Sequence, residues 1–135
     1  MKQKLTIYGD GGSRENPGEA AYGFAIFNEE DGLVFSEGKK IGINTNNVAE
    51  YSAVINALKW VLSNMPESSI TFCLDSQLVA SQMSGKYKVK HPNMKELFIK
   101  AKQLETQLQV SIEYTPYQEK KIRLQINWLM MPSTD

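Results

Sequence analysis

The sequence contains little that would set it apart from ordinary globular proteins. Its single cysteine, Cys73, cannot form an internal disulfide, and its apolar neighbours favour a place in the core. No apolar stretch approaches the roughly 20 residues of a membrane span, and the N-terminus lacks the long apolar segment of a signal peptide. We therefore expect a cytoplasmic protein with no membrane partner.

The chain also lacks net charge, because 15 Lys and Arg residues balance 15 Asp and Glu residues. Its overall field would not attract a polyanion, so a nucleic acid would have to be bound by a local patch. With 41% hydrophobic and 22% charged residues among 135, the composition is that of a globular protein with its own core. We expect one domain over residues 1–135, and a monomer.

Apolar periodicity and turn residues predict an α/β protein. The first strand should end in a turn at Gly9–Gly12, and the first three strands should form an antiparallel meander. The later order of strand, helix and strand favours parallel crossovers. Strands are predicted at Lys4–Tyr8, Ala21–Phe27, Leu33–Ile41, Ile70–Leu74 and Val110–Tyr114, and helices at Asn47–Asn64, from Asp75–Ser76 to Met83, at Pro92–Gln107 and after Pro116.

Three acidic residues stand where predicted elements begin or end. Asp10 follows the first strand, Glu50 lies in the first turn of the long helix, and Asp75 follows the fourth strand. If the first and fourth strands are neighbours, the three carboxylates converge and repel one another, and a hard cation such as Mg²⁺ or Mn²⁺ would stabilise them. Such a site favours phosphoryl chemistry with two ions about 3.5–4 Å apart. Taken singly, each acid is better explained as a turn residue, a helix cap or a partner of the helix dipole, and only the three together with their flanking sequence favour a metal site.

The sequence around these acids resembles the type 1 ribonuclease H family from Leu5 to Pro116. Three motifs carry the resemblance: IYGDGGSRENPG at Ile7–Gly18, TNNVAEY at Thr45–Tyr51 and LDS at Leu74–Ser76. The resemblance implies a mixed five-stranded sheet flanked by helices. It also implies endonucleolytic hydrolysis of the RNA strand of RNA/DNA hybrids, which leaves 5′-phosphate and 3′-hydroxyl ends.

The resemblance also assigns roles to residues. Asp10, Glu50 and Asp75 become metal ligands. Amide and hydroxyl side chains can donate to and accept from 2′-hydroxyls and phosphates, and glycines allow close backbone approach, although tight turns and helix capping are alternative reasons for these residues. Lys86 and Lys88 form a short basic stripe with Lys90, which is either a DNA-strand contact or a solvated face. The expected substrate contacts are Gly11, Gly12, Asn16, Thr45, Asn46, Gln77, Lys86 and Lys88.

The end of the chain departs from the family pattern. Members of the family usually carry a fourth active-site Asp at the start of the last helix, but no Asp lies between Asp75 and Asp135. Codons chosen for Lys121–Asp135 and read one nucleotide earlier can spell KNQAADKLVNDALD and a stop, the usual family ending, which suggests a frameshift. The lost Asp then falls at Ile126, and we predict that the neighbouring Asn127 is the fourth ligand, with Gln125 as runner-up.

Two functions follow from these residues. The first is a hybrid-specific ribonuclease that uses Mg²⁺ or Mn²⁺, and the second is a weakened or inactive hybrid-binding module without the fourth carboxylate. A DNA-cutting nuclease of the same fold is disfavoured by Asn16 and the Thr45–Asn47 segment.

Overall fold

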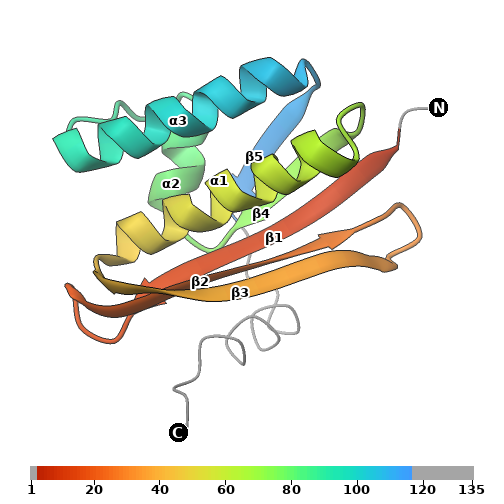
Figure 1. Cartoon of the computed structure of the whole chain (residues 1–135). Helices are drawn as coiled ribbons and strands as arrows, with labels where there is room; N and C mark the ends of the chain where they lie inside the picture. The colour runs from red at the N-terminus through yellow and green to blue at the C-terminus, as the bar shows by residue number, and fades with distance from the viewer. Residues whose placement is uncertain (1–2, 117–135) are drawn as a thin grey trace, which may run out of the picture.

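A five-stranded sheet and three helices make up the fold (Figure 1). The computed structural model describes residues 3–116. The strands are β1 (Lys4–Ser13), β2 (Gly18–Phe27), β3 (Leu33–Asn44), β4 (Ser69–Leu74) and β5 (Ile112–Pro116), and the helices are α1 (Asn46–Asn64), α2 (Gln77–Met83) and α3 (Pro92–Leu108). Within this range, no helix is both long enough and apolar enough to cross a membrane.

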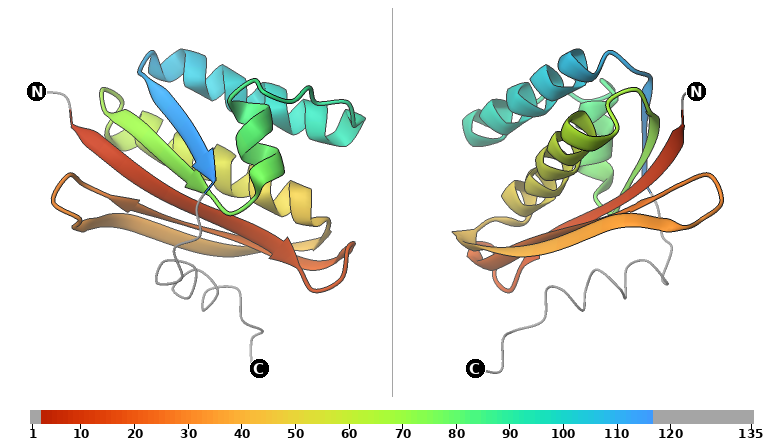
Figure 2. Two further views of the ribbon diagram at one scale, coloured as in Figure 1. Left: turned by 180° about the vertical axis from the view of Figure 1, so that it is seen from behind. Right: turned by 45° about the vertical axis from the view of Figure 1, so that its right-hand side comes forward.

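The sheet is mixed, with strand order β3-β2-β1-β4-β5. The first three strands pair antiparallel as a meander, while β4 runs parallel to both β1 and β5. The described helices lie on one side of the sheet, as Figure 2 shows. The predicted α/β class, with a mixed five-stranded sheet, is confirmed.

The core lies between α1 and the centre of the sheet. Tyr51 and Phe72 are fully buried there, and Cys73 is buried on β4, as predicted. Trp60 is half-buried and stacks on Phe35 with ring centroids 4.8 Å apart. The apolar spacing of α1 thus fixes which face of the helix meets the sheet.

The predicted turn at Gly9–Gly12 was wrong, because β1 continues through it to Ser13. Residues 9–13 pair with residues 20–24 of β2, and Gly9 also pairs with Leu74 of β4. Hydrogen bonding to neighbouring strands outweighs the local turn preference of the glycines. Asp10 therefore lies inside a central strand rather than after it.

Other boundaries moved by one to three residues. Thr45 caps α1, since its Oγ1 accepts from the N–H of Val48 at 3.2 Å, so the helix starts at Asn46 and Glu50 lies just beyond the first turn. Gln109 ends α3 in a left-handed conformation (φ 54°), and β5 starts later than predicted, at Ile112. Strands β2 and β3 extend beyond the predicted ranges, to Gly18 and Asn44.

Candidate metal centre

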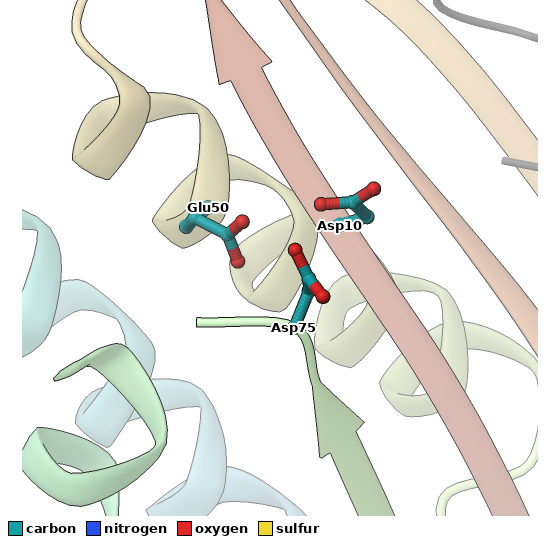
Figure 3. Close-up of side chains that lie close together, drawn as sticks. All are labelled: Asp10, Glu50 and Asp75. Atoms are coloured by element: carbon teal, nitrogen blue, oxygen red, sulfur yellow. The ribbon is translucent and has the colours of Figure 1, made fainter. Parts of the chain in front are cut away.

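Asp10, Glu50 and Asp75 come together at one edge of the sheet (Figure 3). Each offers a carboxylate oxygen, and these oxygens lie within 4.8 Å of one another. Asp10 and Glu50 are buried, with 6% and 5% of their surface exposed, while Asp75 is half-buried. The structure therefore brings together the three acids that the sequence pattern singled out.

Parallel pairing of β1 and β4 explains why the two aspartates meet. Gly9 lies opposite Leu74, so Asp10 and Asp75 are each one residue beyond this pair at the same end of the two strands. The backbone N–H of Asp75 donates to the carbonyl oxygen of Gly9 at 3.3 Å, which holds the chain against β1 as it leaves the sheet. Both carboxylates are thus mounted on the most buried part of the fold.

Gly11 explains how Glu50 reaches the aspartates. A Cβ at Gly11 would lie 2.3 Å from the carbonyl carbon of Ala49 and 2.6 Å from the nitrogen of Glu50. Only glycine permits this close approach of α1 to β1. We predicted a substrate contact for Gly11, and the structure supplies a reason of a different kind: its missing side chain makes room for the helix.

Burial and a neighbouring negative charge decide the electrostatics of Glu50. Burial, and then the negative charge of Asp10, raise the pKa of Glu50 to about 9, although the backbone N–H groups of Gly11 and Ser76 act in the opposite direction. The Gly11 N–H donates to Glu50 Oε1 at 3.1 Å, whereas the buried Oε2 has no hydrogen-bond partner among the described residues. Neither ion pair found in residues 3–116 involves the cluster.

An oxygen-only ligand set with an unpartnered buried oxygen fits a divalent cation. Mg²⁺ and Mn²⁺ prefer carboxylate oxygens, and a bound cation would remove the repulsion that raises the pKa of Glu50. The cluster can therefore hold metal. Which ion binds, and how many, stays a prediction.

The predicted substrate residues Asn16, Thr45 and Asn46 lie together beside this edge. Asn46 Oδ1 accepts from the backbone N–H and the hydroxyl of Ser13 at 2.8 and 3.1 Å, and Asn16 Oδ1 accepts from the N–H of Asn46 at 3.0 Å. These bonds use only the amide oxygens. Within the described range, the two exposed amide NH₂ groups have no acceptor and can still donate.

Other predicted contacts are more scattered. Gly12 lies two residues beyond Asp10 on β1, and the exposed Gln77 opens α2 directly after Asp75 and Ser76. Lys86 and Lys88 are exposed between α2 and α3, and neither forms an ion pair within residues 3–116. Asn127 and its alternative Gln125 lie outside the described residues.

Some features of the site were missed from the sequence. The bonds from Ser13 to Asn46 and from Tyr51 to Gln82 join segments at least 31 residues apart, so no local pattern reveals them. The Thr45 cap could have been found, because Thr stands directly before the apolar periodicity begins.

Comparison with known proteins places the chain in a family. The ribonuclease H family model matches residues 2–128. The chain belongs to the ribonuclease H family. It is 40% identical over 115 residues to the bifunctional protein Rv2228c of Mycobacterium tuberculosis, a match that covers 84% of this chain and 31% of the relative. It is 38% identical over 103 residues to ribonuclease HI of Halobacterium salinarum, covering 76% and 51%.

Solved structures agree with this assignment. The N-terminal RNase H domain of Rv2228c superposes with a TM-score of 0.87 at 34% identity, over 96% of this chain and 94% of that one. LC11-RNase H1 in complex with an RNA/DNA hybrid gives 0.87 at 33% identity, over 93% of both chains. This ribonuclease H chain spans about a third of the mycobacterial relatives and half of the halobacterial one.

Proposed function

We propose that this ribonuclease H chain hydrolyses the RNA strand of RNA/DNA hybrids with two divalent cations, leaving 5′-phosphate and 3′-hydroxyl ends. The observation that carries the proposal is the cluster of Asp10, Glu50 and Asp75, whose carboxylate oxygens lie within 4.8 Å of one another. The likeness to LC11-RNase H1, whose structure contains an RNA/DNA hybrid, supports the substrate class. One core shared by the described elements favours a single catalytic domain over residues 1–135.

The roles of the three acids follow from their placement. Asp10 and Glu50 are buried on β1 and α1 and would hold Mg²⁺ or Mn²⁺ rigidly, while Asp75 is half-buried and would be the acid nearer to solvent and substrate. Divalent cations bound there would supply the Lewis acidity that activates water and stabilises the leaving oxygen. The protein positions the cations and the RNA strand.

Selection of RNA would rest on hydrogen bonds to 2′-hydroxyls. The amide oxygens of Asn16 and Asn46 are held by the chain, so each amide is oriented and its NH₂ group faces outward to donate. Gln77, at the start of α2, offers a third amide near Asp75. A site built to pair with a hydroxyl rejects a strand that lacks it, because the pairing groups then lose their partners.

The DNA strand would be held through its phosphates. Thr45 and the start of α1 offer a hydroxyl and the positive end of a helix dipole, with no acidic residue in the first turn to repel an anion. The exposed Lys86 and Lys88 would add a second contact. Two lysines predict a shallow dependence of binding on salt.

The missing fourth carboxylate favours a second candidate function. No Asp lies between Asp75 and Asp135, so the chain could bind hybrids and cut them weakly or not at all. We propose instead that Asn127 ligates metal through its amide oxygen. An amide brings no charge, so we expect weak metal binding and reduced but real activity.

One assay separates these functions. A labelled RNA/DNA hybrid, an RNA duplex and a DNA duplex of the same sequence are incubated with Mg²⁺ or Mn²⁺, with EDTA as the blank. We expect metal-dependent cuts only in the RNA strand of the hybrid. Cleavage of the DNA duplex would favour the DNA-cutting nuclease, and hybrid binding without any cut would favour the binding module.

A further inference from the structure

A buried hydrogen bond joins α1 to α2 beside the carboxylate cluster. The hydroxyl of Tyr51 donates to Gln82 Oε1 at 2.6 Å. Tyr51 is 0% exposed and Gln82 is 5% exposed. A hydrogen bond of this kind is strong and directional in the low dielectric of a protein interior, so it fixes how the two helices are placed relative to each other.

Both partners are close along the chain to residues of the cluster. Tyr51 directly follows Glu50 in α1, and Gln82 lies in the last turn of α2. Helix α2 begins immediately after Asp75 and its N-cap, Ser76, whose Oγ accepts from Val79 at 3.2 Å. A movement of α2 would therefore be passed directly to Asp75.

The two helices also meet at the cluster itself. The backbone N–H of Ser76 faces the Glu50 carboxylate and favours its charged form. Helices α1 and α2 are thus linked at both ends of α2: by Ser76 and Glu50 at the cluster, and by Gln82 and Tyr51 at the far end. The Tyr51–Gln82 bond would therefore set the orientation of α2, and with it the position of Ser76 beside Glu50.

Helix α2 depends on such a link because it is short. It has seven residues, which is too few to be stable without tertiary contacts. Its buried Val79, Ala80 and Met83 hold it against the core, but apolar packing tolerates small shifts better than a hydrogen bond does. The Tyr51–Gln82 bond restrains its position relative to α1, while Lys102 of α3 donates to the carbonyl oxygen of Met83 at 2.7 Å.

We propose that the Tyr51–Gln82 hydrogen bond positions the metal site, by holding α2 so that Asp75 and Ser76 keep their places relative to Glu50. This inference rests on the proposed function, since it takes the cluster to be a metal centre. Groups that orient metal ligands without touching the metal typically change metal affinity by roughly 10- to 100-fold when they are removed. Tyr51 and Gln82 act one step further out, so we expect about a tenfold effect.

The test compares metal affinity in full-length variants by calorimetric titration with Mn²⁺. Tyr51→Phe and Gln82→Met each remove the bond with little change of shape, and each should bind Mn²⁺ about tenfold more weakly. Saturating Mn²⁺ should restore most of the hybrid cleavage. The matched control is Tyr22→Phe, which removes another buried tyrosine hydroxyl, one that donates to Glu37 at 2.7 Å between β2 and β3. This control should lose thermal stability but keep its Mn²⁺ affinity.

The double variant Tyr51→Phe/Gln82→Met separates positioning from stability. Removing both partners leaves no unsatisfied buried group, so thermal stability should partly return while Mn²⁺ affinity stays weak. Wild-type affinity in either folded single variant, or affinity that recovers together with stability in the double variant, would overturn the positioning role. Failure of the wild-type chain to bind Mn²⁺ would instead overturn the metal centre itself, and this inference with it.

Discussion

Two polar clusters in this chain differ in whether every buried side-chain oxygen has a hydrogen-bond partner within residues 3–116. In the first, Asp10, Glu50 and Asp75 gather three acids, and Glu50 Oε2 is buried without a hydrogen-bond partner among the described residues. In the second, between α3 and β5, Glu105 accepts from the hydroxyl of Tyr114 and pairs with Lys102 at 3.1 Å. Lys102 also donates to the carbonyl oxygen of Met83 at 2.7 Å.

The contrast indicates what each cluster is for. The Glu105 cluster is complete without a ligand, and its bonds tie α3 to β5 and to the end of α2. The carboxylate cluster instead leaves Glu50 Oε2 buried without a partner within residues 3–116, and the pKa of Glu50 is raised. A strongly perturbed carboxyl group of this kind is a physical mark of a candidate functional site. The following variants test this difference.

The largest effect is expected from Asp10→Asn. The amide keeps the size of the side chain but removes a charge that would hold the cations, so cleavage should fall by about a hundredfold or more. Binding of the hybrid should persist, because it rests on phosphate and 2′-hydroxyl contacts. Cleavage rates and a gel-shift titration measure the two properties. Retention of more than about a few per cent of the wild-type rate would remove Asp10 from the site.

Gly11→Ala should separate α1 from β1. The added Cβ would lie 2.3 Å from the backbone carbon of Ala49, and backbone cannot give way cheaply. We expect a loss of about 1–3 kcal/mol in the free energy of unfolding, together with weaker metal binding, because Glu50 is pushed from the aspartates. Denaturant unfolding and Mn²⁺ titration measure both.

The control for this variant is Gly9→Ala on the same face of β1. There the new Cβ would meet the side chains of Phe72 and Leu74 at 3.0 and 3.2 Å, and side chains can shift. The loss of stability should be smaller. Equal losses in the two variants would mean that the approach of α1 at Gly11 is not a special constraint.

Removing one charge from each cluster should have opposite effects on stability. Glu50→Gln should stabilise the metal-free chain, because the neutral amide relieves the repulsion by Asp10. Glu105→Gln should destabilise it by roughly 1 kcal/mol, because Lys102 loses its partner and the bond to Tyr114 is weakened. Thermal unfolding in EDTA compares the two variants. Destabilisation by both would contradict the repulsion between Glu50 and Asp10.

The contribution of Glu50 to the stability of the metal-free chain should also depend on pH. The folded-state pKa of Glu50, about 9, lies above the ordinary value of 4.5, so the folded chain binds the extra proton between these values. The stability that protonation of Glu50 contributes is therefore fully present below pH 4.5 and is lost as the pH rises towards 9. Unfolding in EDTA across this range should show the loss in wild type and not in Glu50→Gln. Parallel curves would contradict the raised pKa.

Asn127→Asp should have the smallest effect, a several-fold gain in activity at low Mg²⁺. The change restores a fourth negative charge, which a hard cation attracts more strongly than an amide. The gain should be smaller with Mn²⁺, which is less strict about geometry than Mg²⁺. Asn127→Ala is the control and should lower activity. If neither variant changes the rate or the metal dependence, the site works with three carboxylates.

The sequence predicted the architecture because local and long-range signals agree. The apolar spacing of α1 and the alternation in the strands predicted the order of the elements, and the parallel pairing expected of β1 and β4 brought Asp10 near Asp75, although β1 does not end there. The turn predicted at Gly9–Gly12 failed because pairing with β2 on one side and β4 on the other decides that segment. In a sequence, glycine indicates a flexible backbone. Only the structure shows that the missing side chain of Gly11 makes room for α1.

The details of the site were less accessible from the sequence. Glu50 is buried, and its Oε2 lacks a hydrogen-bond partner among the described residues. Both properties depend on the packing of three elements. The orientation of Asn16 and Asn46 depends on mutual bonds across 30 residues or more. Residue types and their spacing predict the class of chemistry at the site. Burial and hydrogen-bond pairing decide how strongly each group binds a ligand.

The most direct test of the central claim is a crystal of the chain soaked in Mn²⁺ and measured at a wavelength where manganese scatters anomalously. The account predicts an anomalous peak roughly 2 Å from carboxylate oxygens of Asp10, Glu50 and Asp75. It also predicts that the peak disappears in Asp10→Asn at the same Mn²⁺ concentration. A wild-type crystal with no peak among these three side chains at saturating Mn²⁺ would contradict the claim that the cluster is a metal centre.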